Sequence, residues 1–159
     1  MHIRYQIEST KAQEAFERAP EVMERNLERF LSRGSQEVAR EARRAAPKAF
    51  SNLVNSIHAF RVGILHWRVS PSVKHAPFVE DGTRPHFPNP ESLQPWVERV
   101  LGLRDKEARD KAYLIARAIS RRGTKAQPYM RPSAEKMESR VFQLLREGVD
   151  AGLQEAFGQ

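Results

Sequence analysis

The chain has 159 residues, of which 40% are hydrophobic and 30% charged, and this composition fits one globular domain. It contains no cysteine, which excludes a disulfide framework and thiolate metal ligation. No run of about 18 apolar residues occurs, and the first residues lack the apolar core of a signal peptide. We therefore expect a soluble protein that has no membrane partner.

The positive charge is concentrated in one part of the chain. The formal net charge is +7, from 27 basic and 20 acidic residues. Residues 99–146 carry 13 of the basic and 5 of the acidic residues, a net of +8, which leaves 14 against 15 elsewhere. Such a patch could face nucleic acid or an acidic protein partner, or it could be a solvated helix face.

The N-terminal third predicts one strand and two helices. Residues 3–7 alternate between apolar and polar side chains, as a half-buried strand does. A short helix is expected over residues 10–18, and Pro20 then suits the first position of a second helix. Pro47 ends that helix, while Gly34 either bends or interrupts it.

The middle of the chain predicts an antiparallel hairpin. Residues 56–62 and 64–70 are strand-like, and Gly63 marks the turn between them. Phe78 and Val79 are expected to add a short third strand. The exposed edge of so small a sheet is usually blunted or paired with another subunit, which favours oligomerisation.

The C-terminal half predicts an extended segment and three helices. Residues 84–90 hold three prolines and should run extended over the surface. Asn89 then caps a helix that begins at Pro90 and ends near Gly102. The next helix is expected over residues 105–122, ending at Gly123.

The last helix is expected from about Ser133 to Phe157, after a loop over residues 124–132. Gly148 and Gly152 either permit a close helix approach or weaken the helix end, since each glycine costs about 1 kcal/mol relative to alanine. The whole pattern predicts one α+β domain over residues 1–159. Its small antiparallel sheet, formed by the N-terminal strand plus the hairpin, packs with one long N-terminal helix and three C-terminal helices.

The sequence offers little support for catalysis. There is no cysteine nucleophile, no Gly-x-Ser-x-Gly elbow and no glycine-rich phosphate loop. The best candidate metal ligands are two histidines and two carboxylates, whose spacing matches no known metal motif: His75, Glu80, Asp81 and His86. We expect no enzyme, no cofactor and no metal.

Nucleic-acid binding is a stronger alternative. Tyr129 could stack on a base, and five cations lie near Gly123: Arg117, Arg121, Arg122, Lys125 and Arg131. Arg121 and Arg122 also fall in the last turn of a helix, where cations favourably meet the helix dipole. No helix-turn-helix, zinc-finger or RNA-recognition signature accompanies them.

Three blocks of sequence resemble one family. The first is Ala46-Pro47 followed by Asn52–Ile57, the second is His75–Arg84, and the third runs from Ile115 through Arg122–Pro132. In their order and spacing they are similar to the tail-completion or head–tail joining (neck) proteins of tailed bacteriophages, including the Z-type minor tail proteins of lambda-like phages. The family commonly has threonine-glycine where this chain has Ser51-Asn52, and an aromatic residue where it has His75.

The resemblance implies a structural virion protein of a long-tailed phage or prophage, a subunit of the neck or upper tail that completes the tail and joins it to the head. It would assemble in the bacterial host cytoplasm. Its expected partners are copies of itself, as a hexameric ring, and neighbouring neck or tail proteins, with DNA in the channel as a further contact. The alternative is a non-sequence-specific nucleic-acid-binding protein that uses the basic C-terminal half.

The expected protein interface centres on the turn at Gly82. It comprises Phe78, Glu80, Gly82, Thr83, Arg84 and Tyr129, because aromatic residues and arginine are natural interface anchors. The other explanation is internal: Phe78 buried under the loop and Glu80 paired with Arg84. The five cations near Gly123 are the expected contacts with DNA or with an acidic partner.

Overall fold

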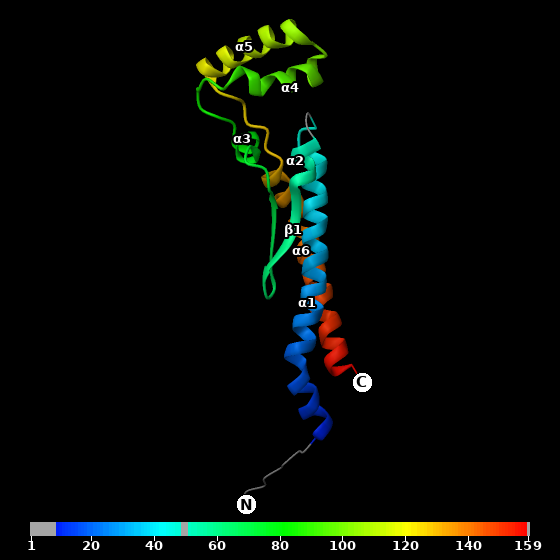
Figure 1. The fold of residues 1–159 in the computed structure, drawn as a ribbon. Helices are drawn as coiled ribbons and strands as arrows, with labels where there is room; N and C mark the ends of the chain where they lie inside the picture. Colours follow the sequence, from blue (N-terminus) through cyan, green and yellow to red (C-terminus); the bar gives the residue numbers. More distant parts are fainter. Residues whose placement is uncertain (1–8, 49–50, 159) are drawn as a thin grey trace, which may run out of the picture. The chain divides into compact units, whose positions relative to one another are not determined.

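The computed structural model describes residues 9–48 and 51–158, so the strand predicted over residues 3–7 lies outside the described residues. Its elements are α1 (Thr10–Ala45), α2 (Ser51–Ser56), β1 (Ile57–Gly63), β2 (His66–Pro71), α3 (Ala76–Asp81), α4 (Pro90–Leu101), α5 (Asp105–Arg122) and α6 (Met130–Phe157) (Figure 1). The predicted α+β class is confirmed. None of the described helices is long and apolar enough to cross a membrane.

The chain divides into two compact units. Unit 1 combines the described parts of residues 1–37, 59–68 and 137–159, and unit 2 combines those of residues 38–58 and 69–136. The boundaries fall inside α1, inside both strands and inside α6. Each unit is therefore built from segments that are distant in the sequence.

Unit 1 is built on the antiparallel packing of α1 against α6. A methyl group at Gly34 would touch Val141 and Leu144 at 3.6 Å, whereas one at Gly148 would lie 3.2 Å from the Cβ of Phe30. At Gly152 it would lie 2.4 Å from the sulfur of a methionine on α1. Of the two interpretations of the α6 glycines, close helix approach is therefore the one observed.

Carboxylates of α1 tie this pair and the hairpin together. Glu28 accepts hydrogen bonds from the indole nitrogen of Trp67 at 2.8 Å and from the backbone N–H of Leu65 at 3.0 Å, and it pairs with Arg61 at 2.7 Å. Glu37 pairs with Arg140 at 3.1 Å, and this hydrogen bond lowers the pKa of the glutamate. The hairpin and α6 are thus both anchored to the same helix.

The helix α1 is continuous, so the predicted break between residues 18 and 20 is wrong. Pro20 lies inside it. A proline in a helix interior costs about 3 kcal/mol because it loses its own N–H bond and crowds the preceding turn. Helix-forming residues on both sides, together with the packing of α1 on α6, offset this cost. Gly34 does not interrupt the helix either.

The predicted hairpin is confirmed, but its turn is not at Gly63. β1 runs through Gly63, and the turn is formed by Ile64 and Leu65. Leu65 has a positive φ of 50°, and its N–H is held by Glu28. The sheet in the described part of the chain has only these two strands. The third strand predicted at Phe78 and Val79 is wrong, because these residues belong to α3.

Unit 2 contains the α4–α5 helical hairpin, whose core is Val97, Ala108 and Ala112. Leu93, Trp96, Leu103 and Ile115 pack around that core. The side chain of Asn89 accepts from the N–H of Glu91 at 3.0 Å, and Gly102 ends α4 in the left-handed conformation. The boundaries predicted for both helices are confirmed.

Candidate functional site

The turn predicted as an assembly loop is preceded by a short helix, α3. Its first turn is closed by the N–H groups of Phe78 and Val79, which both bond to the carbonyl of His75, at 3.1 and 3.2 Å. Ala76 is buried, whereas the ring of Phe78 is 60% exposed. In a strand, Ala76 and Phe78 would point to the same face of the sheet. In this helix they point to nearly opposite sides, so Ala76 is buried and Phe78 faces outward.

Glu80, on the same helix, caps the start of α6. One carboxylate oxygen accepts the N–H groups of Tyr129 and Met130 at 2.7 and 2.9 Å, and the other accepts that of Arg131 at 3.0 Å. These donors lack partners within the helix, and a negative charge is favoured at the positive end of the helix dipole. This cap explains why α6 begins at Met130, three residues before the predicted start.

The cap also controls the ionisation of Glu80. Partial burial alone would raise the pKa of the carboxyl, but the three N–H groups and the nearby Arg131 outweigh it and lower the pKa below its ordinary value. The predicted pairing of Glu80 with Arg84 is not observed, because backbone N–H groups hold its carboxylate. Its predicted place at a protein interface stays a prediction.

Gly82 and Thr83 join the second and third sequence blocks. Thr83 and Thr124 exchange two backbone hydrogen bonds, at 3.1 and 3.2 Å, and their hydroxyls lie 2.9 Å apart. Gly82 has φ +74°, and a Cβ there would come within 2.5 Å of the Thr124 carbonyl oxygen. On the other side, a Cβ at Gly123 would come within 1.9 Å of the Thr83 oxygen. Two glycines therefore allow two backbones to touch.

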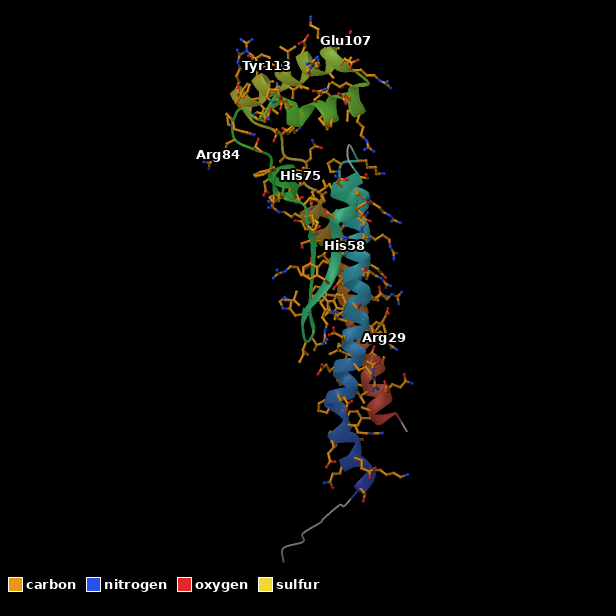
Figure 2. The ribbon with its side chains drawn as sticks, viewed as in Figure 1. Arg29, His58, His75, Arg84, Glu107 and Tyr113 are labelled. Atoms are coloured by element: carbon orange, nitrogen blue, oxygen red, sulfur yellow. The ribbon has the colours of Figure 1, made fainter. Side chains whose placement is uncertain are left out.

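Of the six residues predicted at the interface, Phe78 and Arg84 have strongly exposed side chains. Figure 2 shows Arg84 on the segment that follows α3, with its side chain directed away from the ribbon. Tyr129 is 1% exposed, so its predicted place at an interface, or as a base-stacking platform, is wrong. Burial, followed by the charge of Glu80, raises the pKa of its phenol, whose hydroxyl has no protein partner.

The candidate metal ligands are not brought together. In residues 9–48 and 51–158 no group of three or more histidine, aspartate or glutamate side chains could hold a metal ion. Glu80 is occupied by backbone N–H groups, and the ring of His86 bonds to the carbonyl of Arg84 at 2.9 Å. His75 and Asp81 remain exposed on the surface.

The five predicted contact cations are all exposed: Arg117, Arg121, Arg122, Lys125 and Arg131. In the described part of the chain the first four make no ion pair, while Arg131 lies near Glu80. Arg121 and Arg122 do occupy the last turn of α5. Their position therefore fits the helix-dipole explanation and leaves their side chains free for a partner.

Sequence reasoning missed an exposed apolar surface on unit 2. The rings of Phe87 and Tyr113 meet edge to face, with centroids 6.2 Å apart, although both are more than half exposed. Leu114 is 55% exposed beside them. A signal was present, since Tyr113 and Leu114 lie opposite the alanine stripe of the same helix.

The comparisons with known proteins give one match. The family described as "Bacteriophage HK97-gp10, putative tail-component" matches residues 10–82, from the start of α1 through Gly82. The predicted resemblance to phage tail or neck proteins is thereby confirmed, while the closer likeness to Z-type proteins stays a prediction. No curated protein and no solved structure matches the chain.

Proposed function

Because residues 10–82 match the model of a phage tail-component family, we propose that the protein is a structural subunit of the neck or upper tail. In this role it completes the tail and joins it to the head, after assembly in the host cytoplasm. It forms a ring of copies, for which six matches tail symmetry, and it contacts neighbouring tail proteins. The proposal assigns no catalytic step to the chain.

The observation that supports this role best is the rigid presentation of Phe78 and Arg84. The glutamate cap on α6 fixes α3 from one side, and the paired backbones of Thr83 and Thr124 fix the turn from the other. An exposed aromatic ring and an exposed arginine on an ordered segment are typical interface anchors. Little conformational entropy would be lost when a partner binds them.

A second observation supports a partner-bound form. Among the described residues, fifteen large apolar side chains are more than one third exposed. Where such side chains meet on the surface, as Phe87 and Tyr113 do, they usually mark a place where another protein binds. The phage tail assembly supplies such neighbours.

The first prediction tests these anchors in a phage or prophage that encodes the protein. Phe78→Ala combined with Arg84→Ala should lower the yield of infectious particles at least tenfold, since truncating two anchors of one interface typically costs 2 kcal/mol or more, on the order of a thirtyfold loss in affinity. Electron microscopy should then show full-length tails and filled heads that are not joined. Purified wild-type protein added to the lysate should restore joining.

Lys74→Ala serves as the control, since this exposed cation lies just before α3. It should leave the particle yield unchanged. Normal particle yields from the double variant would reject Phe78 and Arg84 as anchors. Absence of the protein from purified virions would reject the proposed function itself.

The alternative of non-sequence-specific nucleic-acid binding receives no support from the comparisons. It is retained only as a competing explanation for the exposed cations of α5, where a direct experiment separates it from protein binding.

A further inference from the structure

One face of α5 is largely exposed in the described part of the chain, although the ring of Phe87 meets that of Tyr113. Ala108, Ala112 and Ala116 are buried on its inner side. Directly opposite, at helical spacing, lie the residues that we name the α5 face: Lys106, Asp110, Tyr113, Leu114, Arg117 and Arg121. Tyr113 is 52% and Leu114 55% exposed. Figure 2 labels Tyr113 and, on the same helix, Glu107.

The chemistry of the α5 face fits a protein better than a nucleic acid. Lys106, Arg117 and Arg121 make no ion pair among the described residues, and they surround an apolar centre. An apolar centre with a charged rim is the usual anatomy of a protein interface. Asp110 lies inside the face and would repel phosphate groups, whereas it would tolerate a neighbouring protein.

The chain itself carries a complementary surface in the first half of α1. Four exposed glutamates, spaced by three, four and three residues, share one side of the helix over about 15 Å: Glu14, Glu17, Glu21 and Glu24. We name them the α1 stripe. None makes an ion pair among the described residues, whereas the later glutamates of α1 are all paired: Glu28, Glu37 and Glu41.

An exposed aromatic residue lies in the same part of α1 as the stripe. Phe16 is 69% exposed and meets Phe157 edge to face at 5.2 Å. At about 100° per residue, Phe16 lies about 100° around the helix from Glu17, towards the side of α1 that packs on α6. The α1 stripe thus offers the acidic groups that would complement the cations of the α5 face.

We propose that the α5 face of one copy binds the α1 stripe of a second copy. Arg117 and Arg121 lie against the glutamates of the α1 stripe. Because the two surfaces differ, a bound pair keeps one free α5 face and one free α1 stripe, and such a head-to-tail contact closes into a ring or continues as a filament. This interface deepens the proposed function, since it states how copies of a ring-forming subunit would contact one another.

The experiment uses two charge-reversed proteins. One carries Arg117→Glu and Arg121→Glu, and the other Glu17→Lys and Glu21→Lys. Sedimentation velocity is measured for the wild type, each variant and their equimolar mixture at about 50 mM and about 500 mM salt, because higher salt screens charge pairs. The wild type should associate at low salt and dissociate at high salt.

Each variant alone should associate at least about tenfold more weakly than the wild type, because like charges would face each other. Their mixture should recover association, since both contacts then join opposite charges again. Recovery also excludes misfolding as the cause of the loss. Controls with the same net charges, Lys74→Glu with Arg146→Glu and Glu135→Lys with Glu138→Lys, should behave as the wild type.

Three results would overturn the interface. One is a wild type that stays monomeric at low salt, and another is a mixture that remains monomeric although circular dichroism shows folded proteins. The third is an arginine-reversed variant that associates normally but no longer binds random-sequence duplex DNA, which would assign the α5 face to nucleic acid. Virions that contain the protein would leave the proposed function intact in all three cases.

Discussion

Glu80 is the residue whose role differs most from its predicted one. Its carboxylate accepts three backbone N–H groups from residues 129–131, about fifty positions further along the chain. A carboxylate that binds several N–H groups does the work of a helix cap and adds a charge to it. This single side chain therefore helps to decide where α6 begins, and it fixes α3, which carries Phe78.

Replacing Glu80 by glutamine should lower the free energy of unfolding by about 1–2 kcal/mol at pH 7. The amide keeps one acceptor oxygen but loses the charge and the second acceptor. Urea unfolding followed by circular dichroism measures the loss. Asp81→Asn removes the same charge one position later, from an exposed side chain, and should change stability by less than about 0.5 kcal/mol.

The effect of Glu80→Gln should depend on pH in a defined direction. The folded-state pKa of Glu80 is lowered, so its stabilisation is complete above the ordinary glutamate pKa of about 4.3 and is lost as the pH falls through the lowered value. The stability difference between wild type and variant should therefore be constant near neutrality and shrink below about pH 4. A difference that grows on acidification would contradict the cap.

At the scale of elements, the glycines of the α1–α6 pair differ in the space around them. A methyl group at Gly34 meets Val141 and Leu144 at 3.6 Å, which is ordinary contact. At Gly148 it meets three atoms of Phe30 at 3.2–3.3 Å, including the Cβ, which cannot swing away. The two positions therefore separate helix propensity from close packing.

Gly34→Ala should raise the free energy of unfolding by about 0.5–1 kcal/mol, because alanine is the better helix former and fits the space. Gly148→Ala gains the same propensity but must push Phe30 aside, so its net effect should be at least about 1 kcal/mol less favourable. Thermal or urea unfolding of the two single variants measures the contrast. Equal stabilisation by both would show that the helices can separate at Gly148 without loss.

The elements that local signals define were predictable from the sequence. α4 begins and ends where Asn89 and Gly102 indicate, and α5 ends before Gly123, since a cap or a glycine with positive φ acts within a few residues. The predicted hairpin also appears. These features need no knowledge of distant parts of the chain.

Elements decided by distant contacts were not predictable in the same way. α1 continues through Pro20 while packing on a helix more than a hundred residues later, and the start of α6 is set by Glu80. Local sequence carries no sign of either contact. The candidate site shows the same difference. Phe78 and Arg84 are exposed, as the predicted interface requires, whereas Tyr129 is buried.

At the scale of the whole molecule, the question is whether units 1 and 2 unfold together. Their boundaries fall within α1 (Thr10–Ala45) and within α6 (Met130–Phe157). Helix formation is cooperative, because breaking a helix internally creates two frayed ends. We therefore expect the single domain predicted from the sequence to unfold in one transition.

The two tryptophans allow this expectation to be tested, since Trp67 lies in unit 1 and Trp96 in unit 2. In Trp96→Phe the fluorescence of Trp67 reports on unit 1, and in Trp67→Phe that of Trp96 reports on unit 2. Within each variant, the fluorescence midpoint in urea should coincide with the circular dichroism midpoint. Trp67→Phe also loses the hydrogen bond to Glu28, so both of its midpoints should shift together by about 1 kcal/mol of stability. If the midpoint of the Trp96 fluorescence differed from the circular dichroism midpoint, unit 2 would unfold independently of unit 1. The helices α1 and α6 would then break at residues 37–38 and 136–137.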